Sequence, residues 1–514
     1  METTDKSIIY SSDVLHSRIE NVIDFAIENI GQLEIKAELW NETIAPNITL
    51  ADKVIIETSL LLLITKRNNI FYGAIGNKLK VLGEKLNPYI RCEKNKILLM
   101  RNPQSAAVLG IGHIALNEIG IIDDEFDFLI KRPFLSGEIL NTERLPYRTM
   151  DVFWLNNLIL TSAPIEFENI LPFTIVMSKA HPVYMTSPDV YALTHSLMYI
   201  TDFGTKALNP QIDKVRISET VNAAISYHLL SDNLDILGEL LMSASMLRIT
   251  DSLMVKIGWK LFNNIWDKLG FLPCPTFDSS VFKTLSGNEA SSYAFKHLYH
   301  TTYVGGILSN LLLISEHTYS VKKTIEISTI ETYDWDDLFE KIRNAINLAD
   351  SFSTKFFNKS IIAMMKNRLN NESDLIENED GSTFIEDTII KYFNDKGVSK
   401  YILEIIKNES GFKNKMICSI FFESFLIHAI QEYNLTLLTD TIQQIINLKL
   451  PVSLTFLKAI EFIISQQLPV GAIGSYFVFK ENLDSPEALN ITTELAFSLY
   501  SFEKYVRERV KSDK

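Results

Sequence analysis

The 514-residue sequence is poor in the residues that mark several protein classes. It has only three cysteines, Cys92, Cys274 and Cys418, which lie far apart and form no CxxC pair. This spacing argues against a disulfide scaffold and a zinc finger, and it suits a reducing compartment. The 20 glycines and 15 prolines are few for a chain rich in sheet turns. The composition therefore favours helices.

Positive charge is also scarce. The formal net charge is −14 and no Lys/Arg-rich run occurs, which excludes nucleic acid and anionic membrane surfaces as expected partners. The N-terminus, METTDKSIIYSS, has no basic region followed by an apolar region, so no secretory signal is expected. The longest uncharged run, 297–315, opens with histidines and hydroxyls and is more typical of a buried helix than of a membrane span. We predict a cytoplasmic protein without a membrane or nucleic-acid partner.

The usual catalytic and nucleotide-binding motifs are missing. Walker A, GxGxxG, GxSxG and HExxH do not occur in the sequence. Asp202-Phe203-Gly204 matches the kinase DFG triplet, but the catalytic loop and the glycine-rich loop of kinases are absent. These absences remove the common nucleotide, α/β-hydrolase and zinc-protease interpretations.

What the sequence does contain is a long series of helical patterns joined by short breaks, without strand and helix alternation. We predict an all-α fold, either an α/α toroid or a superhelical array of helix hairpins, with a second helical layer toward the C-terminus. Residues 1–315 are expected to form the domain that carries the polar clusters. Residues 316–334 lose the helical period and are expected to link it to a second helical domain, 335–514.

The most informative stretch is 189–204, DVYALTHSLMYITDFG. Plotted as a helix, it places His195, Tyr199 and Asp202 at i, i+4 and i+7, opposite an apolar stripe. Asp202 is the only charge between Val190 and Thr205, so both faces are expected to be covered. Burying these polar groups requires partners, which indicates either a structural hydrogen-bond network or a functional pocket.

Two further clusters have the same character. On the predicted helix over 143–160, Arg144, Arg148 and Asp151 repeat the i, i+4, i+7 spacing, so an arginine there could pair with Asp202 or clamp an anionic group. A histidine-rich turn opens a buried helix, in which the paired glycines Gly305 and Gly306 permit close helix contact. Its polar members are His297, His300, Thr301, Thr302 and Tyr303.

These residue types suit proton transfer without a cofactor. Imidazoles act as acid or base near neutral pH, and an arginine or tyrosine can stabilise developing negative charge. The predicted catalytic residues are His195, Tyr199, Asp202, His300 and Arg148. The predicted ligand-binding residues are Arg144, Asp151, His297, Thr301, Thr302 and Tyr303.

The sequence assigns no metal ligand and identifies no cofactor. His195 and Asp202 lie about two helical turns apart, roughly 10 Å along the axis, so one ion could scarcely take both. A metal would need His300 and only one of these two residues.

The blocks ERLPYRTMD, YALTHSLMYITDFG and YHTTYVGGIL resemble those of an uncharacterised family of bacterial helical proteins associated with natural-product gene clusters. The resemblance covers residues 100–315 and implies no established activity.

Two functions from different classes remain open. One is an enzyme, cofactor-independent or metal-assisted, or a binding protein for a small molecule or peptide, in bacterial specialised metabolism. The alternative is a noncatalytic helical scaffold or protein-interaction module whose buried polar groups are structural; a protein partner or homo-oligomer stays open in both cases. The sharpest expectation is spatial: His195, Tyr199, Asp202, His300 and Arg148 are predicted to line one cavity, with a hydrogen bond or ion pair between segments.

Overall fold

The computed structural model describes residues 11–35, 37–45, 48–68, 73–162, 164–231, 233–318, 333–372, 382–393, 399–408, 415–474 and 483–512. The predicted linker, 316–334, lies mostly outside these residues. The chain divides into two compact units. Unit 1 comprises Met1–Lys179, Thr186–Val221 and Asn233–Thr324, and unit 2 comprises Ala180–Met185, Asn222–Asp232 and Ile325–Lys514.

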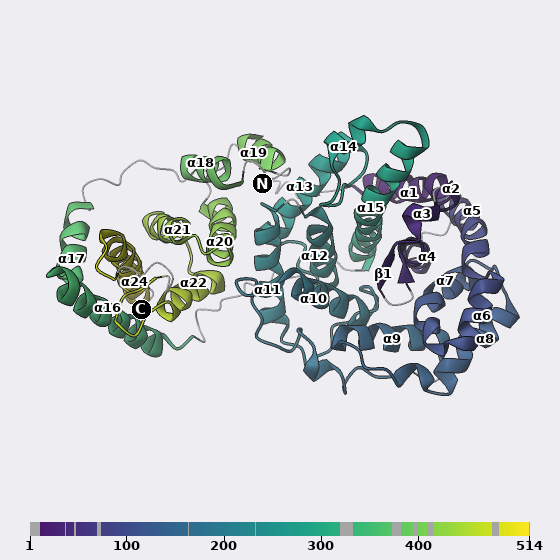
Figure 1. Cartoon of the computed structure of the whole chain (residues 1–514), viewed down its shortest axis with the longest axis horizontal. Helices are drawn as coiled ribbons and strands as arrows, with labels where there is room; N and C mark the ends of the chain where they lie inside the picture. Colours follow the sequence, from purple (N-terminus) through teal and green to yellow (C-terminus); the bar gives the residue numbers. More distant parts are fainter. Residues whose placement is uncertain are drawn as a thin grey trace, which may run out of the picture. The chain divides into compact units, whose positions relative to one another are not determined.

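The predicted all-α class is confirmed, because nearly all described elements are helices (Figure 1). The first half of the series is α1 (Ser12–Asn29), α2 (Gln32–Ile35), α3 (Ala37–Trp40), β1 (Thr43–Ala45), β2 (Ile48–Thr49), α4 (Leu50–Arg67), α5 (Gly73–Ile90), α6 (Glu93–Arg101), η1 (Pro103–Ser105), α7 (Ala106–Glu118), α8 (Asp124–Leu135), η2 (Glu138–Leu140) and α9 (Pro146–Ile159). It continues with η3 (Leu171–Phe173), α10 (Ser187–Ile200), α11 (Lys214–His228), α12 (Leu234–Leu247), α13 (Leu253–Leu269), α14 (Ser279–Thr284) and α15 (Gly287–Thr318). The strands β1 and β2 form a small antiparallel pair.

Helix α15 is the central element of unit 1. It spans 32 residues and packs against α1, α4 and α12, and Figure 1 shows it between α12 on one side and α4 on the other. The predicted close contact at its paired glycines is confirmed. A Cβ atom on Gly305 would lie 2.2 Å from the Trp266 ring of α13, and one on Gly306 would lie 2.9 Å from Val22 of α1. Only glycine permits these approaches.

Helix α12 is buried along its whole length and contacts both α10 and α15. At Gly238 a Cβ atom would lie 2.7 Å from Cγ1 of Val304, so the missing side chain sets how closely α12 approaches α15. This approach places polar groups of the two helices within reach of each other.

The starts of the neighbouring helices follow from local sequence. Thr49 and Asp52 form a capping box at the start of α4, and Thr186 and Asp189 form another at the start of α10. Each pairs a side-chain oxygen with backbone N–H groups that have no partner inside the helix. The two helices therefore begin at fixed positions, and this fixes which of their residues face α15 and α12.

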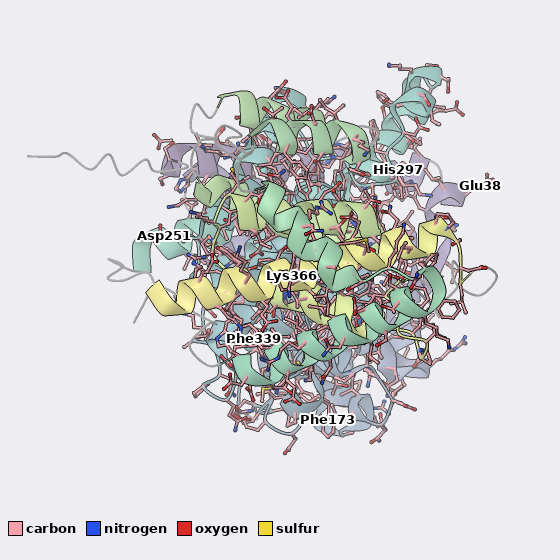
Figure 2. The ribbon with its side chains drawn as sticks, turned by 90° about the vertical axis from the view of Figure 1, so that its left-hand side faces the viewer. Glu38, Phe173, Asp251, His297, Phe339 and Lys366 are labelled. Atoms are coloured by element: carbon pink, nitrogen blue, oxygen red, sulfur yellow. The ribbon has the colours of Figure 1, made fainter. Side chains whose placement is uncertain are left out.

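Unit 2 has its own helices and core. They are α16 (Trp335–Phe357), α17 (Ile361–Glu372), α18 (Ser382–Phe393), α19 (Ser399–Asn408), α20 (Lys415–Gln431), α21 (Leu435–Asn447), α22 (Leu454–Ser465) and α24 (Pro486–Ser512). Phe352 of α16 is buried with Ala472 and Ala488. Phe339, also on α16 and labelled in Figure 2, lies under the guanidinium of Arg507 of α24, whose central carbon is 4.2 Å from the ring centroid.

Among the described residues, no helix is both long and apolar enough to cross a bilayer. The uncharged run over 297–315 belongs to α15, and its side chains are largely buried inside unit 1.

We expect Gly238→Ala to destabilise unit 1. A glycine-to-alanine change inside a helix ordinarily stabilises by up to about 1 kcal/mol, but here the methyl group would overlap Val304 and force α12 away from α15. A net loss of about 1–3 kcal/mol in the free energy of unfolding is expected. Urea unfolding measures it.

Gly31→Ala is the matched control, because a Cβ atom at Gly31 meets nothing within 4 Å. Equal stability of the two variants would show that α12 and α15 do not depend on the close approach at Gly238.

Candidate functional site

The polar centre of unit 1 is an imidazole held between carboxylates. His300 of α15 places Nδ1 2.5 Å from Oε2 of Glu57 of α4 and Nε2 3.0 Å from Oδ1 of Asp235 of α12. Burial alone would lower the pKa of His300, but the negative charges of Glu57 and Asp235 raise it well above its usual value. His300 thus joins three helices as a cation.

Helix α12 supplies a second carboxylate one turn after the first. Asp235 and Glu239 stand at i and i+4, so they share a face of the helix. The hydroxyl of Tyr191 donates to Asp235 over 2.8 Å, and that of Thr194 donates to Glu239 over 2.5 Å. We call Glu57, Asp235, Glu239 and His300 the carboxylate–histidine cluster.

The two acids of α12 differ in protonation. Burial raises the pKa of Glu239 to about 8, and the neighbouring charge of Asp235 adds to the shift. Burial also opposes ionisation of Asp235, but His300 beside it lowers the pKa of Asp235 below its usual value. Asp235 is therefore the charged partner of His300, whereas burial favours the protonated form of Glu239.

His195 of α10 lies next to the cluster. Its Nδ1 is 2.8 Å from the backbone oxygen of Tyr191 and 3.6 Å from Oε2 of Glu239. A carbonyl oxygen only accepts, so Nδ1 carries the proton, which leaves Nε2 as the nitrogen with a lone pair in the neutral ring. Burial lowers the pKa of His195 to about 4, and Arg148 reinforces the shift. His195 is therefore neutral at physiological pH.

Solvent reaches the imidazoles but not the acids of α12. The side chains of His300 and His195 are 24% and 22% exposed, whereas those of Asp235 and Glu239 are 7% and 4% exposed. A ligand that approached from solvent would therefore meet the histidines first.

Three further predicted residues adjoin His195. The Tyr199 ring lies 6.3 Å from that of His195, and burial together with the negative charge of Asp151 of α9 raises the pKa of Tyr199 well above its usual value. Arg148 lies 3.9 Å from Asp151, and its side chain is 53% exposed. The predicted link between segments, like the predicted common cavity, stays a prediction.

Asp202 does not belong to this group. Helix α10 ends at Ile200, and Asp202 follows in a turn with φ +47°, so the predicted i+7 position on a helix is wrong. Both carboxylate oxygens accept from Arg67 of α4 at 2.8 Å, and Trp154 Nε1 donates to Oδ1 at 2.7 Å. The partner of Asp202 is therefore Arg67, not the predicted Arg144 or Arg148.

Arg144 also lies apart. Helix α9 begins at Pro146, so Arg144 precedes it and cannot share a helical stripe with Arg148. Its guanidinium donates to Gln104 over 2.6 Å and to the backbone of Thr142.

The other predicted residues of α15 make contacts that support the fold. His297, labelled in Figure 2, bonds with Thr276 at 2.8 Å, one turn from His300 but outside the cluster. Thr302 accepts from the backbone of Leu272, Tyr303 accepts from Thr58, and Thr301 is fully buried. Their predicted role in ligand binding stays a prediction.

Sequence reasoning missed Glu57, Asp235 and Glu239. The signal was present in α12, because Asp235 and Glu239 are the only charges in LDILGELLMSASML and stand one helical turn apart. Glu57 stands likewise within the apolar sequence VIIETSLLLLI. Isolated carboxylates in such helices require buried partners, just as the histidines do.

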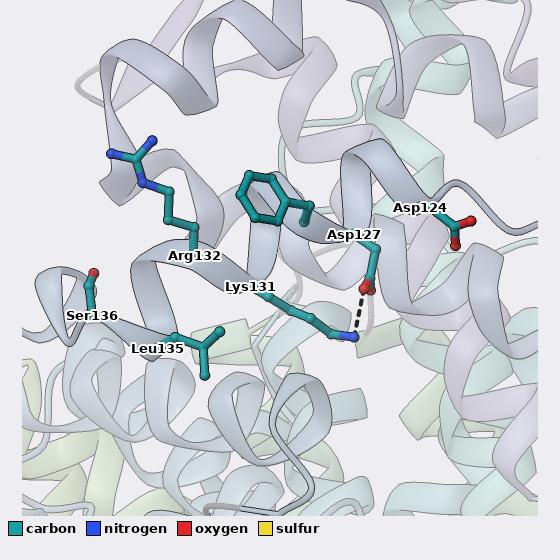
Figure 3. Close-up of a pocket in the computed structure, with 7 residues that line it drawn as sticks. Asp124, Asp127, Lys131, Arg132, Leu135 and Ser136 are labelled. Atoms are coloured by element: carbon teal, nitrogen blue, oxygen red, sulfur yellow. Dashed lines mark ion pairs between the residues drawn. The ribbon is translucent and has the colours of Figure 1, made fainter.

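A separate surface pocket of about 500 Å³ lies on α8 (Figure 3). Its lining side chains all come from α8 and the adjacent Ser136, and they include the ion pair of Lys131 with Asp127 at 2.6 Å. Among the described residues, no second element contributes to this lining, although Asp127 also contacts His113 of α7 at 3.1 Å. The carboxylate–histidine cluster, built by three helices, is the stronger candidate site.

A family model described as a domain of unknown function, DUF6895, matches residues 20–310. The chain belongs to this family. The DUF6895 match includes every residue of the cluster, and it begins farther toward the N-terminus than the predicted resemblance over 100–315. It confirms membership of an uncharacterised family and assigns no reaction. No curated protein and no solved structure matches the chain.

We expect Asp202→Asn to destabilise unit 1 by roughly 3 kcal/mol, because the change leaves the partly buried Arg67 without its charged partner.

The contribution of Asp202 to stability should also depend on pH. Burial opposes ionisation of Asp202, but hydrogen bonds from Arg67 and Trp154 outweigh this effect and lower the pKa of Asp202 in the folded state. The stability that Asp202 adds is therefore present above its unfolded pKa, about 3.9, and is lost as pH falls through the lower folded value. Urea unfolding at pH 7 and below pH 4 measures both effects.

Asp251→Asn is the control, since Asp251 lies 3.7 Å from Lys256 and both side chains are exposed. It should cost less than about 1 kcal/mol at either pH. An equally small cost for Asp202→Asn would contradict the structural role of the Arg67 pair.

Proposed function

We propose that unit 1 is an enzyme domain that binds a small molecule or peptide beside the carboxylate–histidine cluster and uses His195 for proton transfer. The observation that carries this proposal is the orientation of His195. Its Nδ1 is committed to the Tyr191 carbonyl, and its Nε2 has no hydrogen-bond partner among the described side chains. An oriented imidazole with one free nitrogen, partly open to solvent, is the arrangement that a general base needs.

The neighbours of His195 support this role. Arg148 is more than half exposed and is held loosely by Asp151, so it can reorient toward an anionic group of a ligand. Tyr199 is buried, and its ring packs edge-on against that of His195. His195 and Arg148 are thus the groups that would touch a substrate, whereas Tyr199 and Asp151 would position them.

A noncatalytic scaffold is the second candidate. It is favoured by the Asp202 pair with Arg67 and by the contacts of Thr302 and Tyr303, which serve only internal packing. In that case the carboxylate–histidine cluster would serve only to hold the helices of unit 1 together. The two functions predict different effects of replacing His195. If His195 is structural, the replacement lowers the stability of the fold. If His195 is catalytic, the replacement lowers activity and leaves the stability nearly unchanged.

The wider setting belongs to the same proposal. We place the protein in bacterial specialised metabolism and in the cytoplasm, with its helices arranged as an α/α toroid or superhelical array. The scarcity of cysteine, the acidic net charge and the resemblance of three sequence blocks to helical proteins of natural-product gene clusters support this setting. A protein partner or homo-oligomer is compatible with it.

His195→Asn tests the enzyme proposal. The asparagine amide can still donate to the Tyr191 carbonyl, but no basic nitrogen remains at the Nε2 position. We expect the wild-type protein to deplete at least one compound from a cellular small-molecule extract or a peptide mixture. The variant should do so at least about 100-fold more slowly, with a near-normal melting temperature. Mass spectrometry of the mixtures and thermal unfolding provide the measurements.

His16→Asn is the control, because it removes an exposed histidine of α1 that bonds to Ser12 of the same helix. It should keep the wild-type rate. The scaffold function would be favoured instead if the wild-type protein depleted nothing and His195→Asn lowered the melting temperature by several degrees.

A further inference from the structure

We propose that Asp235, Glu239 and His300 form a binding site for one divalent transition-metal cation. The inference deepens the proposed function and rests on it in one respect, because the cation would lie beside His195. The ligands themselves do not include His195, so metal binding can be tested separately from proton transfer.

The distances among the three side chains fit this assignment. One oxygen of Asp235, one oxygen of Glu239 and one ring nitrogen of His300 all lie within 4.8 Å of one another. Ligand atoms around a tetrahedral cation with bonds near 2.1 Å stand about 3.4 Å apart. A small closure of the side chains, without movement of the helices, would bring the three atoms to bonding distance.

The ligands stand on rigid elements. Asp235 and Glu239 project from one face of the buried helix α12, and His300 comes from α15. Gly238 lies between the two acids in sequence and sets the close approach of α12 to Val304 of α15. The glycine that permits close packing therefore also brings the imidazole to the carboxylates.

Glu57 holds the imidazole in the orientation that a metal ligand needs. Its carboxylate lies 2.5 Å from Nδ1, so Nε2 is the nitrogen that faces Asp235. Metal-binding histidines usually present one nitrogen to the ion and donate the other N–H to a carboxylate or carbonyl. Glu57 would thus be a positioning residue and not a ligand.

An oxygen at the centre of the site lacks a well-formed partner. Oδ1 of Asp235 is buried and accepts no aligned hydrogen bond, although Nε2 of His300 lies 3.0 Å away. The charge of this oxygen is offset by His300, but its hydrogen-bonding capacity is not used, and a cation bound in place of the imidazole proton would use it.

The ligand types narrow the choice of ion. One imidazole with two carboxylates suits Zn²⁺, Mn²⁺ or Fe²⁺ better than Ca²⁺ or Mg²⁺, which prefer oxygen ligands throughout. Three protein ligands leave at least one coordination position for water or a substrate atom. The side chain of His300 is partly exposed, so solvent reaches the site on the side of this ligand.

The experiment is calorimetric titration of the metal-stripped full chain with Zn²⁺ and, separately, with Mn²⁺. We expect one ion per chain and a dissociation constant in the micromolar range or below. Asp235→Asn and His300→Gln should each weaken binding at least 100-fold. Glu57→Gln, which keeps all three ligands, should weaken it 10- to 100-fold. His16→Gln, at an exposed histidine of α1 that bonds to Ser12 of the same helix, should leave it unchanged.

Acidity provides a second readout. A cation and a proton compete for the same ligand atoms, so binding should weaken as pH falls and should release protons to the buffer. Titrations in two buffers with different ionisation enthalpies measure the protons released. Binding of a surface-bound ion would instead be weakened by His16→Gln or by neither ligand variant.

Several outcomes would overturn the inference: no binding of either ion by the folded chain, or equal binding by the wild-type protein and His300→Gln. If Asp235→Asn fails to fold, Glu239→Gln, which retains an acceptor for Thr194, replaces it. The two proposals fail separately. If the protein depletes a compound but binds no metal, only the proposed cation site is wrong. If it binds metal but depletes no compound, only the proposed enzyme function is wrong.

Discussion

The contact of one imidazole with two carboxylates determines how the polar centre of unit 1 is built. His300 touches Glu57 with one nitrogen and Asp235 with the other, so α4, α12 and α15 can pack only where these charges meet. Removing any one member would leave an uncompensated buried charge, which costs several kcal/mol. The close approach at Gly238 satisfies this electrostatic constraint and the packing of α12 on α15 together.

The sequence was sufficient for the class of fold and for part of the site. Low glycine and proline content, scarce cysteine and repeated helical periods predict an all-α chain, and the structure has one. His195 and His300 were selected because their helices carry almost no other charge, and the structure places both next to Glu239. The same reasoning applied to α12 would have found Asp235 and Glu239.

The sequence-based errors concern features that the periodic spacing of residues along a helix does not determine. The stripe through Asp202 assumed that the helix continued past Ile200, whereas consecutive positive φ angles at Asp202, Phe203 and Gly204 turn the chain away. Helix spacing also gives no partner across space: Arg67 and Asp202 are separated by 135 residues. Pairings of this kind depend on how helices pack, which a single sequence does not specify.

Tyr191 contributes to the centre twice. Its backbone oxygen accepts from His195, and its hydroxyl donates to Asp235. The same turn of α10 carries Thr194, whose hydroxyl donates to Glu239. A ligand that displaced this turn through His195 would therefore act on both acids of α12 together.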